Sequence, residues 1–273
     1  MSQLKLGVIA SLTDSPEESL QRVRSLGFPT CQVSIGDTMS LDERMAARLR
    51  QAADRFEIEV TTIWTHCRGG QIWDFLSGPA TIGLVPVDTR AEALKRLKKG
   101  SEFARWVGVP SITTHVGFIP ENPGDPQYAP LVAALKDIAI YCLSNNQHFW
   151  FETGQETPTT LLRTIEDIGT DNLGVNLDPA NLVMYGKANP VDALDVIGRY
   201  VRGVHAKDGE YPTNGRALGV EKALGEGRVN FPVLIPRLKS LGYTGAITIE
   251  REVRGLAQLA GFEQARRVLE PLL

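Results

Sequence analysis

The sequence predicts an α/β fold of the (β/α)8 barrel type, because short apolar runs alternate with longer amphipathic stretches along the whole chain. Segments with a helical period separate the apolar runs, for example 15–27, 41–56 and 90–108. Strands that each lead into a helix are the pattern of a closed parallel barrel, and we expect residues 1–273 to form one such domain. Eight runs have the character of buried strands: 4–10, 30–36, 58–66, 111–118, 148–154, 172–180, 201–208 and 245–252.

Capping residues mark where several of the expected helices begin and end. Ser15 and Pro16 precede two glutamates at the start of the first helical segment, which suits the positive end of a helix. Gly27, Gly108 and Gly242 lie near the C-terminal ends of expected helices, where glycine commonly ends a helix.

An open doubly wound sheet is the structural alternative to the barrel. A nucleotide-binding sheet of that kind has a glycine-rich turn directly after its first strand. Here the corresponding segment reads "ASLTDSPE", which contains no glycine. The barrel is therefore favoured.

The two longest connections of the barrel, 67–88 and 209–230, are expected to lie at the C-terminal face as lids or substrate walls.

The bulk composition restricts the classes of partner. The 273 residues carry a formal net charge of −3, which gives no overall attraction for nucleic acid or for an anionic membrane surface. The three cysteines have no metal-binding spacing and favour a reducing compartment. No apolar segment is long enough to span a membrane, and the N-terminus lacks the pattern of a signal peptide. We expect a soluble, cytoplasmic protein.

Charged and imidazole side chains recur at the C-terminal ends of the expected strands. In a (β/α)8 barrel these ends converge on one mouth, whereas the interior is packed with branched apolar residues. Three carboxylates and three histidines would be costly to bury together unless a cation lay among them. Oxygen and imidazole donors suit Mn²⁺, Mg²⁺, Co²⁺ or Zn²⁺. The six residues, one from each of the last six strands, are His66, His115, Glu152, Asp178, His205 and Glu250.

Several motifs resemble one known family. The segments "FETGQETP", "NLDPANLVMYG", "VHAKDG", "GEGRVNFPVLIPRLKSLGY" and "ITIEREV" are similar to the sugar phosphate isomerase/epimerase family of xylose isomerase-like TIM barrels. The resemblance implies one divalent metal, with Mn²⁺ expected first and Co²⁺, Mg²⁺ or Zn²⁺ as alternatives. It assigns the metal ligands to Glu152, Asp178, His205 and Glu250, and the acid–base pair to Glu152 and Glu250.

The resemblance also implies a reaction. A member of this family would act on a small sugar, ketose or cyclitol, by abstracting a proton α to a carbonyl and forming a metal-stabilised enediolate. Isomerisation or epimerisation is the leading expectation. A lyase or dehydratase acting on a keto-sugar, keto-glycoside or inosose would use the same site. A non-catalytic sugar-binding barrel is a further alternative.

A phosphodiesterase resembling endonuclease IV is disfavoured. Those relatives bind three metals and need a histidine three residues after the aspartate of strand six, a position that Asn181 occupies here. They need another histidine after strand seven, and no histidine follows His205. The substrate is therefore expected to be a small carbohydrate or cyclitol, with no nucleic acid and no membrane as partner, and self-association to a homo-oligomer is open.

Further residues are candidates for contacts with the substrate. Lys207 lies two residues after His205 and hence on the same face of the strand. For most of these residues a role in core packing or in orienting a neighbour is an open alternative. The expected substrate-binding residues are His66, His115, Asn181, Lys207, Trp64 and Glu156, with Trp73, Phe118 and Tyr185 as a candidate apolar wall. Whether the substrate is phosphorylated is not determined by these motifs.

Overall fold

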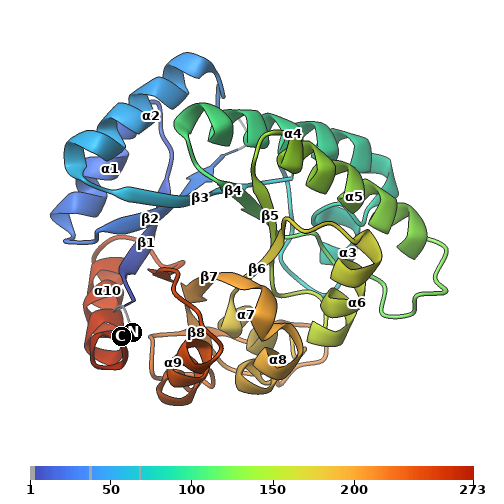
Figure 1. Cartoon of the computed structure of the whole chain (residues 1–273). Helices are drawn as coiled ribbons and strands as arrows, with labels where there is room; N and C mark the ends of the chain where they lie inside the picture. Colours follow the sequence, from blue (N-terminus) through green and yellow to red (C-terminus); the bar gives the residue numbers. More distant parts are fainter. Residues whose placement is uncertain (1–3, 37–38, 68) are drawn as a thin grey trace.

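Eight parallel strands close into a barrel in the computed structural model, which describes residues 4–36, 39–67 and 69–273 (Figure 1). The order around the barrel is β1-β10-β7-β6-β5-β4-β3-β2, and the parallel pairing of β1 with β2 completes it. The predicted (β/α)8 fold is thereby confirmed. The barrel strands are β1 (Leu6–Ser11), β2 (Thr30–Ile35), β3 (Glu59–Thr65), β4 (Ser111–Thr114), β5 (His148–Glu152), β6 (Leu173–Leu177), β7 (Val201–Ala206) and β10 (Ile247–Ile249).

Helices form an outer ring around the strands (Figure 1). Because they cover the outside of the barrel, β5 and β6 are buried almost throughout, as parallel strands require. The longer helices are α1 (Pro16–Ser25), α2 (Glu43–Phe56), α4 (Val87–Val107), α5 (Tyr128–Ser144), α6 (Pro158–Ile168), α8 (Pro190–Ile197), α9 (Phe231–Ser240) and α10 (Leu256–Leu269). Shorter helical segments are α3 (Gly78–Thr81), α7 (Pro179–Met184), η1 (Gly198–Tyr200) and η2 (Glu270–Leu272).

Local sequence sets the ends of the helices. Asp42 accepts a hydrogen bond from the backbone N–H of Met45 at 2.8 Å and so caps the start of α2. Gly108, with φ of 90°, ends α4 in the left-handed conformation, as its position in the sequence predicts. The start of α2 and the end of α4 are thereby fixed by single residues.

Several strands are shorter than their apolar runs. The run 111–118 predicts a strand of that length, but β4 ends at Thr114. Val116 and Ile119 beyond it are buried in the core without belonging to the sheet. The apolar pattern therefore predicts which residues are buried, but it does not predict where the strand ends. Hydrogen bonding to the neighbouring strands stops where the chain leaves the sheet.

The two long connections contain small elements of their own. The β3–α4 connection includes α3, and the β7–α9 connection includes the antiparallel pair β8 (Asp208–Gly209) and β9 (Glu221–Lys222). Asp208 anchors the second connection, because its carboxylate accepts backbone N–H groups from residues 209, 225, 227 and 229 at 2.9–3.1 Å. Both connections lie where the sequence predicts long loops.

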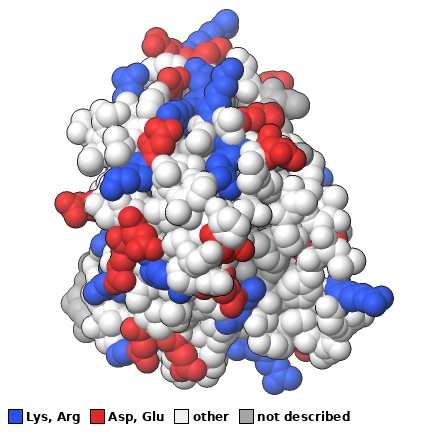
Figure 2. All heavy atoms as spheres, turned by 90° about the vertical axis from the view of Figure 1, so that its right-hand side faces the viewer, with Lys and Arg blue, Asp and Glu red and all other residues white. Residues whose placement is uncertain are grey.

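The surface in Figure 2 carries acidic and basic side chains interspersed with one another. This face offers no continuous positive stripe of the kind that follows a nucleic-acid backbone. Within the described ranges, no helix is long and apolar enough to cross a bilayer. Cys31, Cys67 and Cys142 are buried and unbridged.

Candidate active site and metal centre

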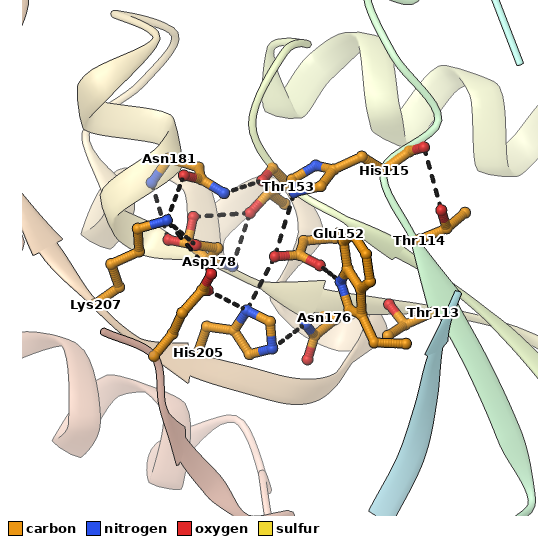
Figure 3. A network of polar contacts seen from close by, with 12 residues as sticks. Thr113, Thr114, His115, Glu152, Thr153, Asn176, Asp178, Asn181, His205 and Lys207 are labelled. Atoms are coloured by element: carbon orange, nitrogen blue, oxygen red, sulfur yellow. Dashed lines mark hydrogen bonds and ion pairs between the residues drawn. The ribbon is translucent and has the colours of Figure 1, made fainter. Parts of the chain in front are cut away.

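Four side chains from consecutive strands of the barrel meet at its C-terminal mouth. Glu152 is the last residue of β5, and Asp178 follows β6 and caps α7. His205 lies in β7, and Glu250 follows β10. One ligand atom of each residue lies within 4.8 Å of those of the other three. The structure thus brings together all four residues that the sequence predicts as metal ligands, three of which are labelled in Figure 3.

The His205 imidazole lies between the two glutamates. Its Nδ1 is 2.9 Å from Oε1 of Glu152 and 2.8 Å from Oε2 of Glu250. Burial lowers the pKa of His205, but the two carboxylates outweigh burial and raise this pKa well above its usual range. Without a cation, the ring is therefore held as an imidazolium by the charges that would otherwise surround a metal.

Both oxygens of Glu152 have partners. Trp64 donates its indole N–H to Oε2, and Nε2 of His115 lies 3.4 Å from Oε1. Burial raises the pKa of Glu152, but His115 and His205 outweigh burial and bring the pKa well below its ordinary value. Two histidines and an indole thus compensate the charge of a glutamate that ends a buried strand.

Asp178 is fixed by the turn that follows β6. Its Oδ1 accepts the backbone N–H of Asn181 at 2.9 Å, and its backbone N–H and C=O both bond the hydroxyl of Thr153 at 2.9 Å. Burial, with a further contribution from Glu250, raises the pKa of Asp178 to about 7, against the opposing charge of Lys207. Oδ1 thus holds the turn, and Oδ2 remains directed at the cluster.

Lys207 supplies a positive charge beside the carboxylates. Its Nζ is 3.5 Å from Oε1 of Glu250 and 3.8 Å from Oδ2 of Asp178, and it also contacts Glu252 and the Asn181 side chain. Burial lowers the pKa of Lys207, but the carboxylates outweigh burial and keep it well above the ordinary value. Burial raises the pKa of Glu250, but Lys207 and His205 outweigh burial and lower this pKa to about 2.

The donor set fits a divalent cation. Asp178 Oδ2, His205 Nδ1 and Glu250 Oε2 are buried, and none makes a hydrogen bond of good geometry within the described part of the chain. Such atoms are costly to bury unless they have a partner. Three carboxylates and one imidazole are suitable ligands for Mn²⁺, Mg²⁺, Co²⁺ or Zn²⁺. One divalent ion would leave a local charge of about −1 before Lys207 is counted.

The cluster opens into a cavity of about 360 Å³. Five of the six predicted substrate-binding residues line it, which places them where a ligand of the cluster would lie. Besides Glu152 and Glu250 the lining includes Trp64, His66, His115, Asn181, Lys207, Trp73, Met184, Tyr185, Leu218 and Glu252. Of the predicted apolar wall, Trp73 and Tyr185 line the cavity, and Phe118 packs edge-on against Tyr185 with ring centroids 5.9 Å apart.

Glu156 does not line this cavity. Its carboxylate is buried, and burial raises its pKa to about 7. Neither of its oxygens has a hydrogen-bond partner among the described residues, and the same holds for the neighbouring Gln155 amide. A direct contact of Glu156 with substrate stays a prediction.

Sequence reasoning did not single out several residues that support the site. Gln32 and Asn176 contact the far side of the His205 ring, Thr153 fixes Asp178, and Glu252 contacts Lys207. A polar residue within an apolar run was the available signal, as in "TCQVSIG" and "LGVNLD". The pattern alone could not show which histidine such an amide reaches.

Comparison with known proteins agrees with this fold. The family model described as xylose isomerase-like TIM barrel matches residues 20–272. The chain therefore belongs to the xylose isomerase-like TIM barrel family.

Three relatives illustrate the range of similarity. The crystal structure of a xylose isomerase domain protein from Planctomyces limnophilus is 35% identical, with a TM-score of 0.93 over 99% of this chain and 98% of that one. An uncharacterized protein of Methanocaldococcus jannaschii is 25% identical over 91% of this chain and 84% of its own. The structure of a D-tagatose 3-epimerase-like protein is 20% identical, with a TM-score of 0.75 and coverage of 98% and 97%, which shows the shared fold.

Proposed function

We propose that the chain is a divalent-metal-dependent isomerase or epimerase that acts on a small sugar, ketose or cyclitol. The observation that carries the proposal is the placement of two glutamates around one candidate metal position beside an open cavity. Glu152 and Glu250 approach the same nitrogen of His205, at 2.9 and 2.8 Å, and both line the cavity. The fold shared with a D-tagatose 3-epimerase-like protein favours a small sugar as the substrate class.

The two glutamates have the protonation state that proton abstraction requires. The pKa of each is lowered, so each carboxylate is ionised near neutral pH and can accept a proton. Glu152 is held by Trp64 and His115, whereas the Glu250 side chain is 20% exposed and faces the cavity more openly. One glutamate would remove the proton next to the carbonyl, and the other, after taking up a proton from solvent, would deliver it to the substrate.

The remaining residues of the site would bind the substrate and the metal. Glu152, Asp178, His205 and Glu250 would hold the cation. When bound, a divalent cation supplies stabilisation of the negative charge that develops on the substrate oxygens. Lys207 offers an ammonium donor at the cavity wall, and the indole rings of Trp64 and Trp73 exclude water from one side.

Metal content and solvent exchange together test the proposal. Protein purified without chelators or a histidine tag is analysed by inductively coupled plasma mass spectrometry, and about one divalent ion per chain is expected. A panel of ketoses and inososes is then incubated in D₂O, where a substrate gains deuterium at the carbon next to its carbonyl. Glu152→Gln and Glu250→Gln should abolish exchange, whereas exposed Glu59→Gln should not.

The outcomes separate the alternatives that the site leaves open. Deuterium uptake with an isomeric product supports an isomerase or epimerase, and uptake with loss of a leaving group would instead make the chain a lyase or dehydratase. Nearly three zinc ions per chain would favour the phosphodiesterase alternative. Absence of any bound divalent ion, even after each metal is added, would overturn the proposal.

A further inference from the structure

Gln32 is an amide in the interior of the barrel, where branched apolar side chains are the rule. It lies in β2, which contributes no residue to the four-residue cluster, and it is 1% exposed. Burying an amide without partners costs about 1–3 kcal/mol. The partners of Gln32 therefore indicate what the residue does.

Gln32 reaches across the barrel to Asn176 of β6 and His205 of β7. Its Nε2 donates to Oδ1 of Asn176 at 2.9 Å, and its Oε1 is 2.8 Å from Nε2 of His205. The amide nitrogen of Asn176 is 3.0 Å from the same His205 nitrogen, a contact visible in Figure 3. The three side chains form a closed triangle on the side of the imidazole opposite the carboxylates.

The backbone is adapted to this triangle at each amide. The register between β2 and β3 shifts between Cys31 and Gln32, and the register between β6 and β7 shifts between Val175 and Asn176. Irregularities of this kind re-aim a side chain and are common next to active sites. A Cβ at Gly203 would lie 2.3 Å from Oδ1 of Asn176, so glycine is needed there to leave room for the amide.

The triangle bears on which nitrogen of His205 can bind a metal. The carbonyl oxygen of Gln32 only accepts hydrogen bonds, so its contact with Nε2 requires a proton on Nε2. If both amides were rotated by 180°, the carbonyl of Asn176 would accept that proton instead. In either arrangement one carbonyl oxygen and one amide nitrogen lie beside Nε2, and in the observed arrangement the Gln32 oxygen is the nearer, at 2.8 Å against 3.0 Å for the Asn176 nitrogen. A neutral ring that donates from Nε2 to this oxygen keeps its lone pair on Nδ1, the nitrogen that faces Glu152 and Glu250.

We propose that Gln32, held by Asn176, is a positioning residue that fixes the Nε2–H tautomer and the ring orientation of His205, so that Nδ1 is the metal ligand. The inference rests on the proposed metal-dependent function and deepens it. It explains why an amide occupies the barrel interior three strands away from the histidine that it serves. Partners of this kind typically contribute 10- to 100-fold to metal affinity.

The test combines a variant with a spectroscopic measurement. Mn²⁺ affinity of metal-free protein is measured by isothermal titration calorimetry for the wild type, Gln32→Met and Gln32→Glu. Gln32→Met removes the acceptor and should weaken binding about 10- to 100-fold. Gln32→Glu restores an acceptor and should recover most of the affinity. Gln147→Met is the matched control, because Gln147 is also a buried, hydrogen-bonded amide but precedes the start of β5, at the end opposite Glu152, and contacts Ser101 and Val109, which do not line the cavity.

The wild type alone provides a second measurement, which does not depend on a variant that folds. Long-range ¹H–¹⁵N correlation spectra of protein loaded with Mg²⁺ or Zn²⁺ should show the proton of His205 on Nε2. A proton on Nδ1, or a Gln32→Met protein with unchanged Mn²⁺ affinity, would overturn the positioning role while leaving the proposed function intact. A wild type that binds no divalent cation would overturn the proposed function together with this inference.

Discussion

The indole N–H of Trp64, at the end of β3, donates a hydrogen bond to the carboxylate of Glu152, at the end of β5. This contact crosses the mouth of the barrel, since β4 lies between the two strands. It fixes the orientation of the carboxylate that we assign as an acid–base group. Trp64 therefore serves the site as a donor and not only as an apolar wall.

Replacing Trp64 by Phe should lower turnover by about 10- to 100-fold, because a hydrogen bond to a charged group contributes about 1.5–3 kcal/mol. The measurement is the rate of α-proton exchange with the best ketose of the panel. Trp106→Phe is the control, since Trp106 lies on α4 and contacts Lys99. Equal rates for both variants would show that the indole N–H has no part in the reaction.

Replacing Lys207 by Met should destabilise the metal-free protein by about 3–5 kcal/mol, the usual cost of removing one partner from a buried ion pair. The ammonium is 3% exposed, and its loss leaves Asp178 and Glu250 without their positive neighbour. Urea unfolding in the presence of a chelator measures this loss, and added Mn²⁺ should recover part of it. Lys222→Met, at a pair that is well exposed, should change the unfolding free energy by less than about 1 kcal/mol.

Removing the metal should lower the unfolding temperature. At a free Mn²⁺ concentration 100 times its Kd, binding stabilises the folded state by about 2.7 kcal/mol. For a chain of this size that corresponds to a shift of about 5–10 °C. Differential scanning calorimetry with Mn²⁺ and then with a chelator measures the shift. The same temperature under both conditions would contradict metal binding at the four-residue cluster.

Alkaline pH should destabilise the fold through its buried thiols. Burial raises the pKa of Cys31 and of Cys142 to about 12 and that of Cys67 to about 11, from an ordinary value of 9.0. Because the folded-state pKa values are raised, the thiols favour folding below pH 9, and this contribution falls as the pH rises towards 11. The unfolding free energy measured between pH 8 and pH 10.5 should decrease.

Thiol reactivity provides an independent check on the same groups. A disulfide reagent at pH 8 should modify none of the three cysteines in folded protein and all three in guanidinium. Rapid reaction of a thiol in the folded state would contradict the burial on which the pH prediction depends.

Asp208→Asn should loosen the β7–α9 connection. The amide keeps one acceptor oxygen, so the bonds from the N–H groups of Gly225 and Gly227, now made to Oδ2, are lost or exchanged for others. We expect a loss of about 2–4 kcal/mol in unfolding free energy and faster proteolysis within residues 209–230. Asp171→Asn, at an exposed position, is the control and should leave both quantities unchanged.

The sequence predicted those features of the structure that depend on where each strand ends. Glu152, Asp178, His205 and Glu250 were among the six strand-end candidates because each follows or ends an apolar run, and parallel strands bring such ends together. The choice of these four from the six came from the family resemblance. Gln32 could not be assigned in the same way, because its partner lies 173 residues away and a register shift sets its direction.

Glu156 shows the limit of motif reasoning in another way. It shares a motif with Glu152, yet it does not line the cavity, and its carboxylate has no hydrogen-bond partner among the described residues. Glu156 is expected from the sequence among the substrate-binding residues, with the orientation of a neighbour as the alternative, and its contact with substrate stays a prediction. The path of the backbone after the strand, which residue spacing does not reveal, determined which of the two glutamates lines the cavity.

The Asp208 anchor has a consequence for how such a barrel can diversify. The Asp208 carboxylate accepts N–H groups from Gly209 and from residues 225–229, so it joins the two ends of the β7–α9 connection. The pairing of β9 with β8 closes the same base from within the span 210–224. Insertions, deletions or grafts within that span can therefore alter the rim of the cavity while His205, three residues before the anchor, keeps its place. We therefore expect changes within this connection to alter which ligands the cavity admits while the four-residue cluster stays in place.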